Sequence, residues 1–386
     1  MNHTIRYDIV TDAHETARSI AVWDIAVRVF HWLLVSLVAL AAASGFIGDR
    51  STVDLHVWAG TAVVGLVVLR IIWGILGTTH ARFASFVRGP SVVIAHARAV
   101  ISGKAGHYVG HNPLGAVMIV GLIVVLAAIG ATGAVVLGGK LKEGPLASFV
   151  PFALGGPAKE IHEALALLLL GLVAMHVTAV IVESLRTRDN LVRAMMTGRK
   201  VLRPGMIDVT RRQARPLLAV LIGMTTLMLA AVVIALLSGR PALGVPVAPL
   251  DAVYGKECGA CHAPHHPSLA TAATWRGIFK GLGDHFGDDA SLDPATTEAL
   301  TSYVIANAAE RWDTQAANRL RQTSPTDPLR ITATPGWARL HRHVPDATFK
   351  RKSVGGRVNC ASCHADAAKG WFAPRAIAVP AEGKNE

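Results

Sequence analysis

Five long apolar stretches constrain the fold of this chain more than any other feature. They lie at residues 25–47, 55–77, 113–138, 160–183 and 216–238. A bilayer core is about 30 Å thick, so a helix of about 20 apolar residues crosses it. None of the stretches alternates polar and apolar residues as a barrel strand does, and helices are the remaining spanning structure. The sequence therefore predicts an all-α transmembrane helical bundle, with four helices in its core and a fifth beside them.

Composition supports this prediction for part of the chain. Of its 386 residues, 52% are hydrophobic and the mean hydropathy is +0.41, which is too apolar for an ordinary soluble protein. A net charge of +12 is also found in nucleic-acid-binding proteins, but here the basic residues gather between the apolar stretches. Membrane lipid, and no nucleic acid, is therefore the expected partner of this charge.

The connections between the stretches predict an orientation. Residues 184–215 carry nine Arg and Lys against two Asp, and residues 78–112 carry four against no acid. The connections 48–54 and 139–159 are charge-balanced or nearly so. Because cytoplasmic loops of inner-membrane proteins are enriched in Lys and Arg, the N-terminus is expected in the cytoplasm. Five crossings then place everything after residue 239 in the periplasm, and no removable signal peptide is visible at the start.

These features divide the chain into five segments. We expect a cytoplasmic N-terminal segment (1–22), a four-helix domain (23–205), a fifth transmembrane helix (206–240), a linker (241–250) and a C-terminal domain (251–386). The linker is predicted from its prolines, in RPALGVPVAPL, which favour a stiff extended chain. The C-terminal domain is predicted to be mostly helical and irregular, with an N-capped amphipathic helix after Asp293.

Four histidines lie within the predicted spans, and ionisable side chains in lipid are costly. A lone histidine is explained equally well by a hydrogen bond across helices. His162 and His176, however, are 14 residues apart on one span. That separation is about 21 Å, or nearly four whole turns, so the two share one helix face, one near each membrane surface.

The other two histidines match these depths. His31 lies about two turns inside the cytoplasmic end of the first span, level with His176, and His56 at the periplasmic start of the second span is level with His162. Zinc prefers tetrahedral clusters that include Cys or carboxylate, which two facing imidazoles do not supply. The sequence therefore predicts two non-covalent, bis-histidine haem b sites, His31 with His176 on the inner side and His56 with His162 on the outer side.

Other residues near the spans have two interpretations. Arg70 lies on the same helix face as His56, towards the cytoplasm, where it either neutralises a propionate of the inner haem or snorkels to the interface. Four tryptophans near span ends are typical of interfacial anchors, namely Trp23, Trp32, Trp58 and Trp73.

Two C-x-x-C-H motifs stand in the C-terminal domain, Cys258-Gly-Ala-Cys261-His262 and Cys360-Ala-Ser-Cys363-His364. In such a motif the two thiols form thioethers with the haem vinyl groups and the histidine binds iron. Two disulfides or two zinc half-sites would use the same cysteines. The histidine after each pair, in a domain expected in the periplasm, favours two covalent haem c groups instead.

Each of these irons needs a sixth ligand. No methionine follows Met228, so the distal ligands are expected to be histidines, or a position is open. The candidates are His265, His266, His285, His341 and His343. The first two follow His262 too closely to reach the opposite haem face. We favour His285 for the first haem and His341 for the second, with His343 as the alternative, and bis-histidine ligation predicts low potentials suited to quinol-level donors.

Residues 20–200 resemble the bacterial cytochrome b-561 family, which includes the b-type subunit of membrane-bound Ni,Fe-hydrogenases. The resemblance rests on VWDIAVRVFHW at His31, LHVWAG at His56, LRIIWGILG followed by ARFASF, GHNPLGAVMI at His111, and the spaced His162 and His176. It assigns the haem ligands to the same four histidines. It also implies that His111 lies near the inner haem or a quinone.

Residues 250–370 resemble a periplasmic dihaem cytochrome c family, through ECGACH, DHFGDDASLD, TSYVIANAAE, WARLH and NCASCH. In that resemblance His285 and His341 take the distal positions. The two likenesses together imply quinone-linked electron transport in a respiratory chain of the bacterial inner membrane.

Three functions remain open at this point. The leading hypothesis is electron transfer between the quinone pool, or a membrane donor, and a periplasmic c-type cytochrome or other redox protein, at most as a quinol:cytochrome c-type oxidoreductase. The second is a superoxide or ferric-ion:quinone oxidoreductase. The third is a haem-bearing anchor subunit of a hydrogenase or dehydrogenase complex. The sequence does not decide whether two copies associate as a homodimer, and no catalytic residue is predicted.

Overall fold

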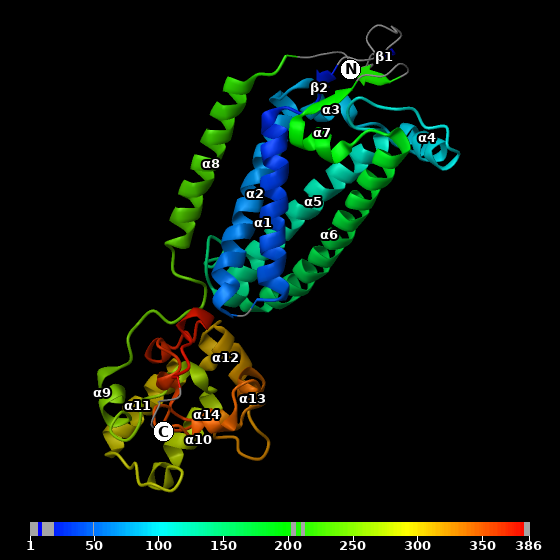
Figure 1. Ribbon diagram of the computed structural model, residues 1–386. Coiled ribbons are helices and arrows are strands. Elements are labelled where there is room, and N and C mark those ends of the chain that lie inside the picture. Colours follow the sequence, from blue (N-terminus) through cyan, green and yellow to red (C-terminus); the bar gives the residue numbers. More distant parts are fainter. Residues whose placement is uncertain (1–6, 10–18, 49, 202–205, 210–212, 382–386) are drawn as a thin grey trace. The chain divides into compact units, whose positions relative to one another are not determined.

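The computed structural model describes residues 7–9, 19–48, 50–201, 206–209 and 213–381 (Figure 1). The chain divides into two compact units. The first comprises Met1–Gly133 and Glu160–Val232, and the second comprises Ala134–Lys159 and Val233–Glu386. The boundary therefore cuts through three of the long helices. Most of the predicted N-terminal segment, at residues 1–6 and 10–18, lies outside the described residues.

Five helices of the described chain are long and apolar enough to cross a membrane, as predicted. They are α1 (Ile25–Phe46), α2 (Val53–Leu76), α5 (Pro113–Val136, continued by a π-helical turn at Leu137–Leu141), α6 (Phe152–Thr187) and α8 (Pro216–Ser238). α6 begins eight residues before the predicted start at 160. Gly155, Gly156 and Pro157 favour a break, but the helix runs through Pro157 with the loss of one backbone hydrogen bond.

The centre of the first unit is a bundle of α1, α2, α5 and α6 (Figure 1). Its core contains Val63 and Val67 from α2, Leu126 from α5 and Leu169 from α6, with leucines of α1 packed against them. α8 has two small buried residues, Ala219 and Gly223. It packs closely against α2 at the second of them, because a Cβ added at Gly223 would lie only 3.0 Å from Leu69 Cδ2. The predicted architecture of a four-helix core plus a fifth helix is therefore present.

One end of this bundle carries short elements that periodicity did not predict. Two antiparallel strand pairs are present, β1 (Tyr7–Ile9) with β4 (Ile207–Val209) and β2 (Ser19–Ala21) with β3 (Arg199–Val201). The short helices α3 (Phe83–Phe86), α4 (Pro90–Ile101) and α7 (Leu191–Thr197) lie at the same end (Figure 1). Strands of three residues are too short to give a recognisable alternation of polar and apolar residues.

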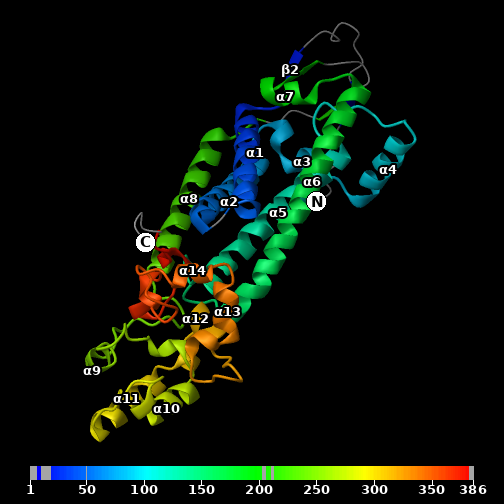
Figure 2. The same ribbon diagram turned by 60° about the horizontal axis from the view of Figure 1, so that its bottom comes forward.

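The second unit contains the C-terminal domain, which is built of short helices joined by irregular segments (Figure 2). The helices are α9 (Ala252–Glu257), α10 (Ala272–Lys280), α11 (Pro294–Ala306), α12 (Gln315–Leu320), α13 (Pro335–His341) and α14 (Asp346–Phe349). The amphipathic helix predicted after Asp293 is α11. The Asp293 carboxylate accepts the Thr296 N–H at 3.0 Å, and Leu300 and Val304 are buried.

Candidate haem sites

The first pair of predicted ligands lies between α2 and α6. The ring centroids of His56 and His162 are 6.0 Å apart. A metal–imidazole bond is about 2 Å long and the bonded nitrogen lies roughly 1 Å from the ring centroid, so two imidazoles on opposite faces of one iron have centroids about 6 Å apart. The two side chains therefore fit a bis-histidine haem.

Backbone carbonyls set the orientation of both rings. His56 Nδ1 lies 2.9 Å from Ala41 O, and His162 Nδ1 lies 3.0 Å from Ile129 O. A carbonyl oxygen only accepts hydrogen bonds, so each Nδ1 carries the proton and donates it. Nε2 of each ring is then left with the lone pair that a metal requires, and hydrogen bonds of this kind orient histidine ligands in metal sites.

Two glycines make room for these rings. A Cβ added at Gly45 of α1 would lie 3.0 Å from His56 Cε1, and one at Gly133 of α5 would lie 3.2 Å from His162 Cε1. Sequence reasoning missed both glycines and both carbonyls. Glycine is frequent in all transmembrane helices, so only the position of the neighbouring helix singles these out.

The second pair consists of His31 on α1 and His176 on α6, whose side chains are close enough to interact electrostatically. Among the described residues, none hydrogen-bonds Nδ1 of His31, which is buried. Arg70 of α2 is buried too; it donates to Ala81 O at 3.2 Å and lies over the ring of Phe83. Arg70 therefore points into the protein rather than towards the interface, and its role at a haem propionate stays a prediction.

His111 lies beside this second pair. Its ring is 4.4 Å from that of Trp23 and 4.7 Å from that of Phe86. Burial, followed by the positive charges of Arg70, His80, Lys200 and His176, lowers the pKa of His111 to about 3. The imidazole is therefore neutral at pH 7, and no described residue hydrogen-bonds its Nδ1. Trp23 is buried against this histidine, so its predicted role as an interfacial anchor was wrong: it belongs to a buried apolar cluster with Val27, Ala194 and Met206.

A small cleft opens next to His111. Its polar lining includes Tyr108 and Arg88, and also His80, whose Nε2 lies 3.6 Å from Asp208 Oδ1. The remaining lining residues are Ser85, Phe86, Gly110 and Ile207. Asp208 and Ile207 come from β4, so residues almost a hundred positions after His111 complete the cleft.

In the C-terminal domain, the first C-x-x-C-H histidine faces its favoured partner. The rings of His262 and His285 are stacked with centroids 6.3 Å apart. His262 Nδ1 lies 2.9 Å from Ala263 O and therefore donates to it. His265 belongs to the same cluster of side chains, with its ring 5.2 Å from that of His262. Burial and then the charges of His262 and His285 lower the pKa of His265 to about 4.

The second C-x-x-C-H histidine faces His341. The ring centroids of His341 and His364 are 6.2 Å apart, and His341 Nδ1 lies 2.9 Å from Trp337 O. The indole of Trp337 stacks on His341 at 4.3 Å. His343 is exposed, and its Nε2 accepts a hydrogen bond from Arg342. The structure thus brings His341, rather than His343, to His364, and the spacing again fits a bis-histidine haem.

No disulfide joins the four cysteines. Burial, with a smaller effect of Glu257, raises the pKa of Cys258 to about 11. Burial also raises the pKa of Cys360 to about 11, with Cys363 adding to the shift. Both cysteine pairs precede the histidines of the two facing pairs, as covalent haem c attachment requires.

His266 is a buried residue that the prediction discarded as a ligand and left without a role. Its Nδ1 accepts from the Ser268 N–H, and its ring lies against Gly370, where a Cβ would come far too close. Burial lowers the pKa of His266 to about 4. The residue therefore holds the segment after the first C-x-x-C-H motif against the segment after the second.

A bundle of membrane spans with facing histidines, followed by two C-x-x-C-H motifs, defines a membrane-bound haem protein of electron transport. Family comparisons agree with this class. Residues 22–198 match the prokaryotic cytochrome b561 family and residues 254–372 match the dihaem cytochrome c family, so the chain is a fusion of one member of each. This confirms the two resemblances in the predicted order. Haem b, haem c and an inner-membrane location follow from these families.

Solved dihaem cytochromes are similar to the C-terminal domain. A dihaem cytochrome c from Rhodobacter sphaeroides is 35% identical, and the alignment covers 33% of this chain and 99% of that protein, with a TM-score of 0.28. A dihaem cytochrome from Shewanella baltica OS155 is 31% identical over 36% of this chain and 98% of its own length, with a TM-score of 0.29. No curated protein matches the chain significantly.

Proposed function

We propose that this protein carries electrons between the quinone pool and a periplasmic redox partner, through two haem b and two haem c groups. The observation that carries the proposal is the facing of predicted histidine ligands, three pairs of which have ring centroids 6.0, 6.3 and 6.2 Å apart. Bis-histidine irons have no open position for a substrate, so the protein would move electrons rather than perform bond chemistry at iron.

The charge distribution supports the predicted orientation. With the N-terminus in the cytoplasm, His31 and His176 lie on the inner side, and the C-terminal domain is periplasmic. The haem b groups would be held by the side chains His31, His176, His56 and His162, and the haem c groups by the thioethers and the pairs His262 with His285 and His364 with His341. Bound haem supplies one-electron redox chemistry at each of these positions.

We place the quinone in the cleft beside His111. The neutral imidazole offers an N–H to a quinone oxygen, and Tyr108 offers a hydroxyl. The paired side chains of His80 and Asp208 line the same cleft and can hydrogen-bond to a quinol hydroxyl. The electrostatic interaction of His111 with His176 puts this cleft close to a predicted haem ligand, as electron transfer requires.

The dihaem domain offers two differently charged surfaces to a soluble partner. Five exposed acidic residues and no Lys or Arg lie in residues 281–299 around His285. Six Lys and Arg residues and one acid lie in residues 339–357 around His341. Charge complementarity steers association, so we propose that a basic redox protein docks near His285.

His111→Leu tests the quinone position in membranes. Loss of one hydrogen bond, worth about 1 kcal/mol, should slow haem reduction by a quinol analogue several-fold to about tenfold. Dithionite should still reduce all the haem. His107→Leu, an exposed histidine outside the cleft, is the matched control and should behave as wild type. An unchanged rate in His111→Leu would remove the quinone from this cleft.

A further inference from the structure

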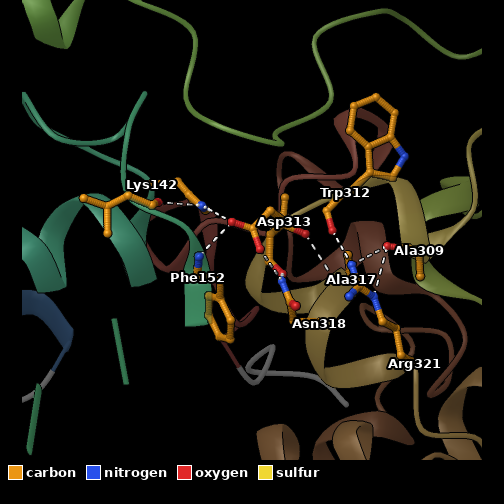
Figure 3. A network of polar contacts seen from close by, with 10 residues as sticks. Lys142, Phe152, Ala309, Trp312, Asp313, Ala317, Asn318 and Arg321 are labelled. Carbon is orange, nitrogen blue, oxygen red and sulfur yellow. Dashed lines mark hydrogen bonds and ion pairs between the residues drawn. The ribbon is translucent and has the colours of Figure 1, made fainter. Parts of the chain in front are cut away.

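Asp313, in the dihaem domain, makes contacts that the predicted haem sites do not explain. Its Oδ2 accepts from Lys142 Nζ at 2.6 Å and from the Phe152 backbone N–H at 2.7 Å (Figure 3). Its Oδ1 accepts from Asn318 Nδ2 at 3.1 Å. Lys142 lies in the α5–α6 connection, residues 137–151, and Phe152 is the first residue of α6. One carboxylate therefore joins the domain to the α5–α6 connection and to the first residue of α6.

Through Phe152, Asp313 caps α6. The first N–H groups of a helix have no partner within the helix, and this end of the helix carries partial positive charge. A carboxylate supplies both a hydrogen-bond acceptor for the N–H and a negative charge beside the positive helix end. Capping residues normally lie directly before their helix, but Asp313 is 161 residues away. α6 is also the helix that carries His162 and His176.

Lys142 links the α5–α6 connection to the same carboxylate. Its side chain is 1% exposed, and its backbone is left-handed, with φ of 57°. Nζ also donates to Val150 O at 3.2 Å, across the turn of the connection. A buried ammonium is costly unless a negative charge accompanies it, and Asp313 supplies that charge.

Further contacts surround this ion pair. Arg375 pairs with Glu143 at 2.9 Å, and the guanidinium of Arg319 lies over the Phe152 ring. The linker is bound as well: Leu243 N–H donates to Ala147 O at 2.8 Å, and Asp313 N–H donates to Gly244 O at 2.7 Å. Gly244 has φ of 65°, and a Cβ there would collide with Asp313. The linker thus lies against the connection and the domain.

We propose that Asp313 is a positioning residue that clamps the dihaem domain to the α5–α6 connection, so that the domain works as a fixed relay and not as a carrier swinging on its linker. The inference rests on the proposed function. One electron passes from a ferrous b haem, which becomes ferric, to a ferric c haem, which becomes ferrous. The clamp keeps the domain in place for every such transfer.

The test uses the full-length, haem-loaded chain with Asp313→Ala. Hydrogen exchange of residues 143–156 should accelerate, because the cap and the partner of Lys142 are lost. In stopped-flow reduction by a quinol, c-haem reduction should fall about tenfold if the docked state drops to roughly a tenth of the molecules. That step should also become slower with added glycerol, which leaves the wild-type step unchanged.

Two variants make the result decisive. Asp313→Asn keeps an oxygen for the Phe152 N–H but loses the negative charge, so an intermediate effect is expected. If Asp313→Ala does not accumulate in cells, Asp313→Asn takes its place in the test. Asp346→Asn is the matched control, since its exposed pair with Arg357 lies within the domain. A fault in quinol oxidation slows b-haem reduction, whereas loss of the clamp slows only the later c-haem step. Unchanged exchange in Asp313→Ala, or a glycerol-dependent wild type, would overturn the proposal.

Discussion

In the membrane bundle the predicted haem ligands stand on helices of 22 to 36 residues, whereas the longest helix of the dihaem domain has 13. The bundle also has an apolar core of Val63, Val67, Leu126 and Leu169, which contains no predicted ligand. In the dihaem domain His262, His285 and His364 lie in turns or just after single 3₁₀ turns. Long helices in lipid need no cofactor to form, but short irregular segments do not hold a shape alone.

The difference in helix length explains why the bundle binds haem without covalent bonds, whereas the dihaem domain attaches haem covalently. In the bundle, the carbonyls of Ala41 and Ile129 already orient His56 and His162. In the dihaem domain, the part before residue 310 has an apolar core around Tyr254, Trp275 and Val304, while the part around the second motif has little apolar packing of its own. There, haem is expected to take the place of a core.

The largest effect should follow removal of the second thioether pair. In Cys360→Ser with Cys363→Ser, the second haem c cannot attach, and residues 335–376 should lose their fold for want of a core. Haem staining should show one covalent haem in place of two. Limited proteolysis should cut within residues 335–376 while the b-haem spectrum is unchanged. If those residues stay protected from proteolysis, the contrast between the two regions is wrong.

Removal of a bundle ligand should have a smaller, local effect. His176→Ala should lose the haem b shared with His31 and keep the other haem b, both haem c groups and the folded bundle, because neither histidine belongs to the apolar core. A pyridine haemochrome assay should find about half the non-covalent haem. Thr178→Ala, two residues along the same helix, bonds only within its helix and serves as the control. Full haem content in His176→Ala would show that the pairing is wrong.

Features set by local sequence could be predicted, whereas features that depend on a distant neighbour could not. The spans follow from lipid thickness, and the histidine levels follow from the helical rise, so His56 and His162 could be paired from residue spacing alone. The C-x-x-C-H motifs are local and need no fold. Gly133 beside His162 could not be foreseen, because its significance depends on which helix is its neighbour. The same is true of Asp313, whose partner Lys142 is 171 residues away.

The fourth helix was misjudged for a related reason. The span was predicted from its apolar stretch, 160–183, and the preceding Gly155, Gly156 and Pro157 are locally unfavourable in a helix. The structure starts α6 at Phe152, where Asp313 accepts the first N–H. A cap supplied from a distant part of the chain overrides local propensity, and no sequence pattern near residue 152 records it.

The smallest expected effect is the loss of the α6 cap when Asp313 is protonated at low pH. Burial alone would raise the pKa of Asp313, but the hydrogen bonds from Lys142, Phe152 and Asn318 and the charge of Lys142 outweigh it, so the pKa lies below the usual 3.8. A carboxyl with a depressed pKa in the folded state stabilises that state above its unfolded pKa, and this contribution is lost as the pH falls through the folded value.

Hydrogen exchange of residues 143–156, after correction for the intrinsic pH dependence, should therefore be constant from pH 7 to about 5 and accelerate modestly below about 4. Asp313→Asn should show no such acid step, and an identical step in that variant would assign the transition to another carboxyl. Because the Asp313 side chain is 26% exposed, solvent screening should keep the effect below those of the haem-ligand variants.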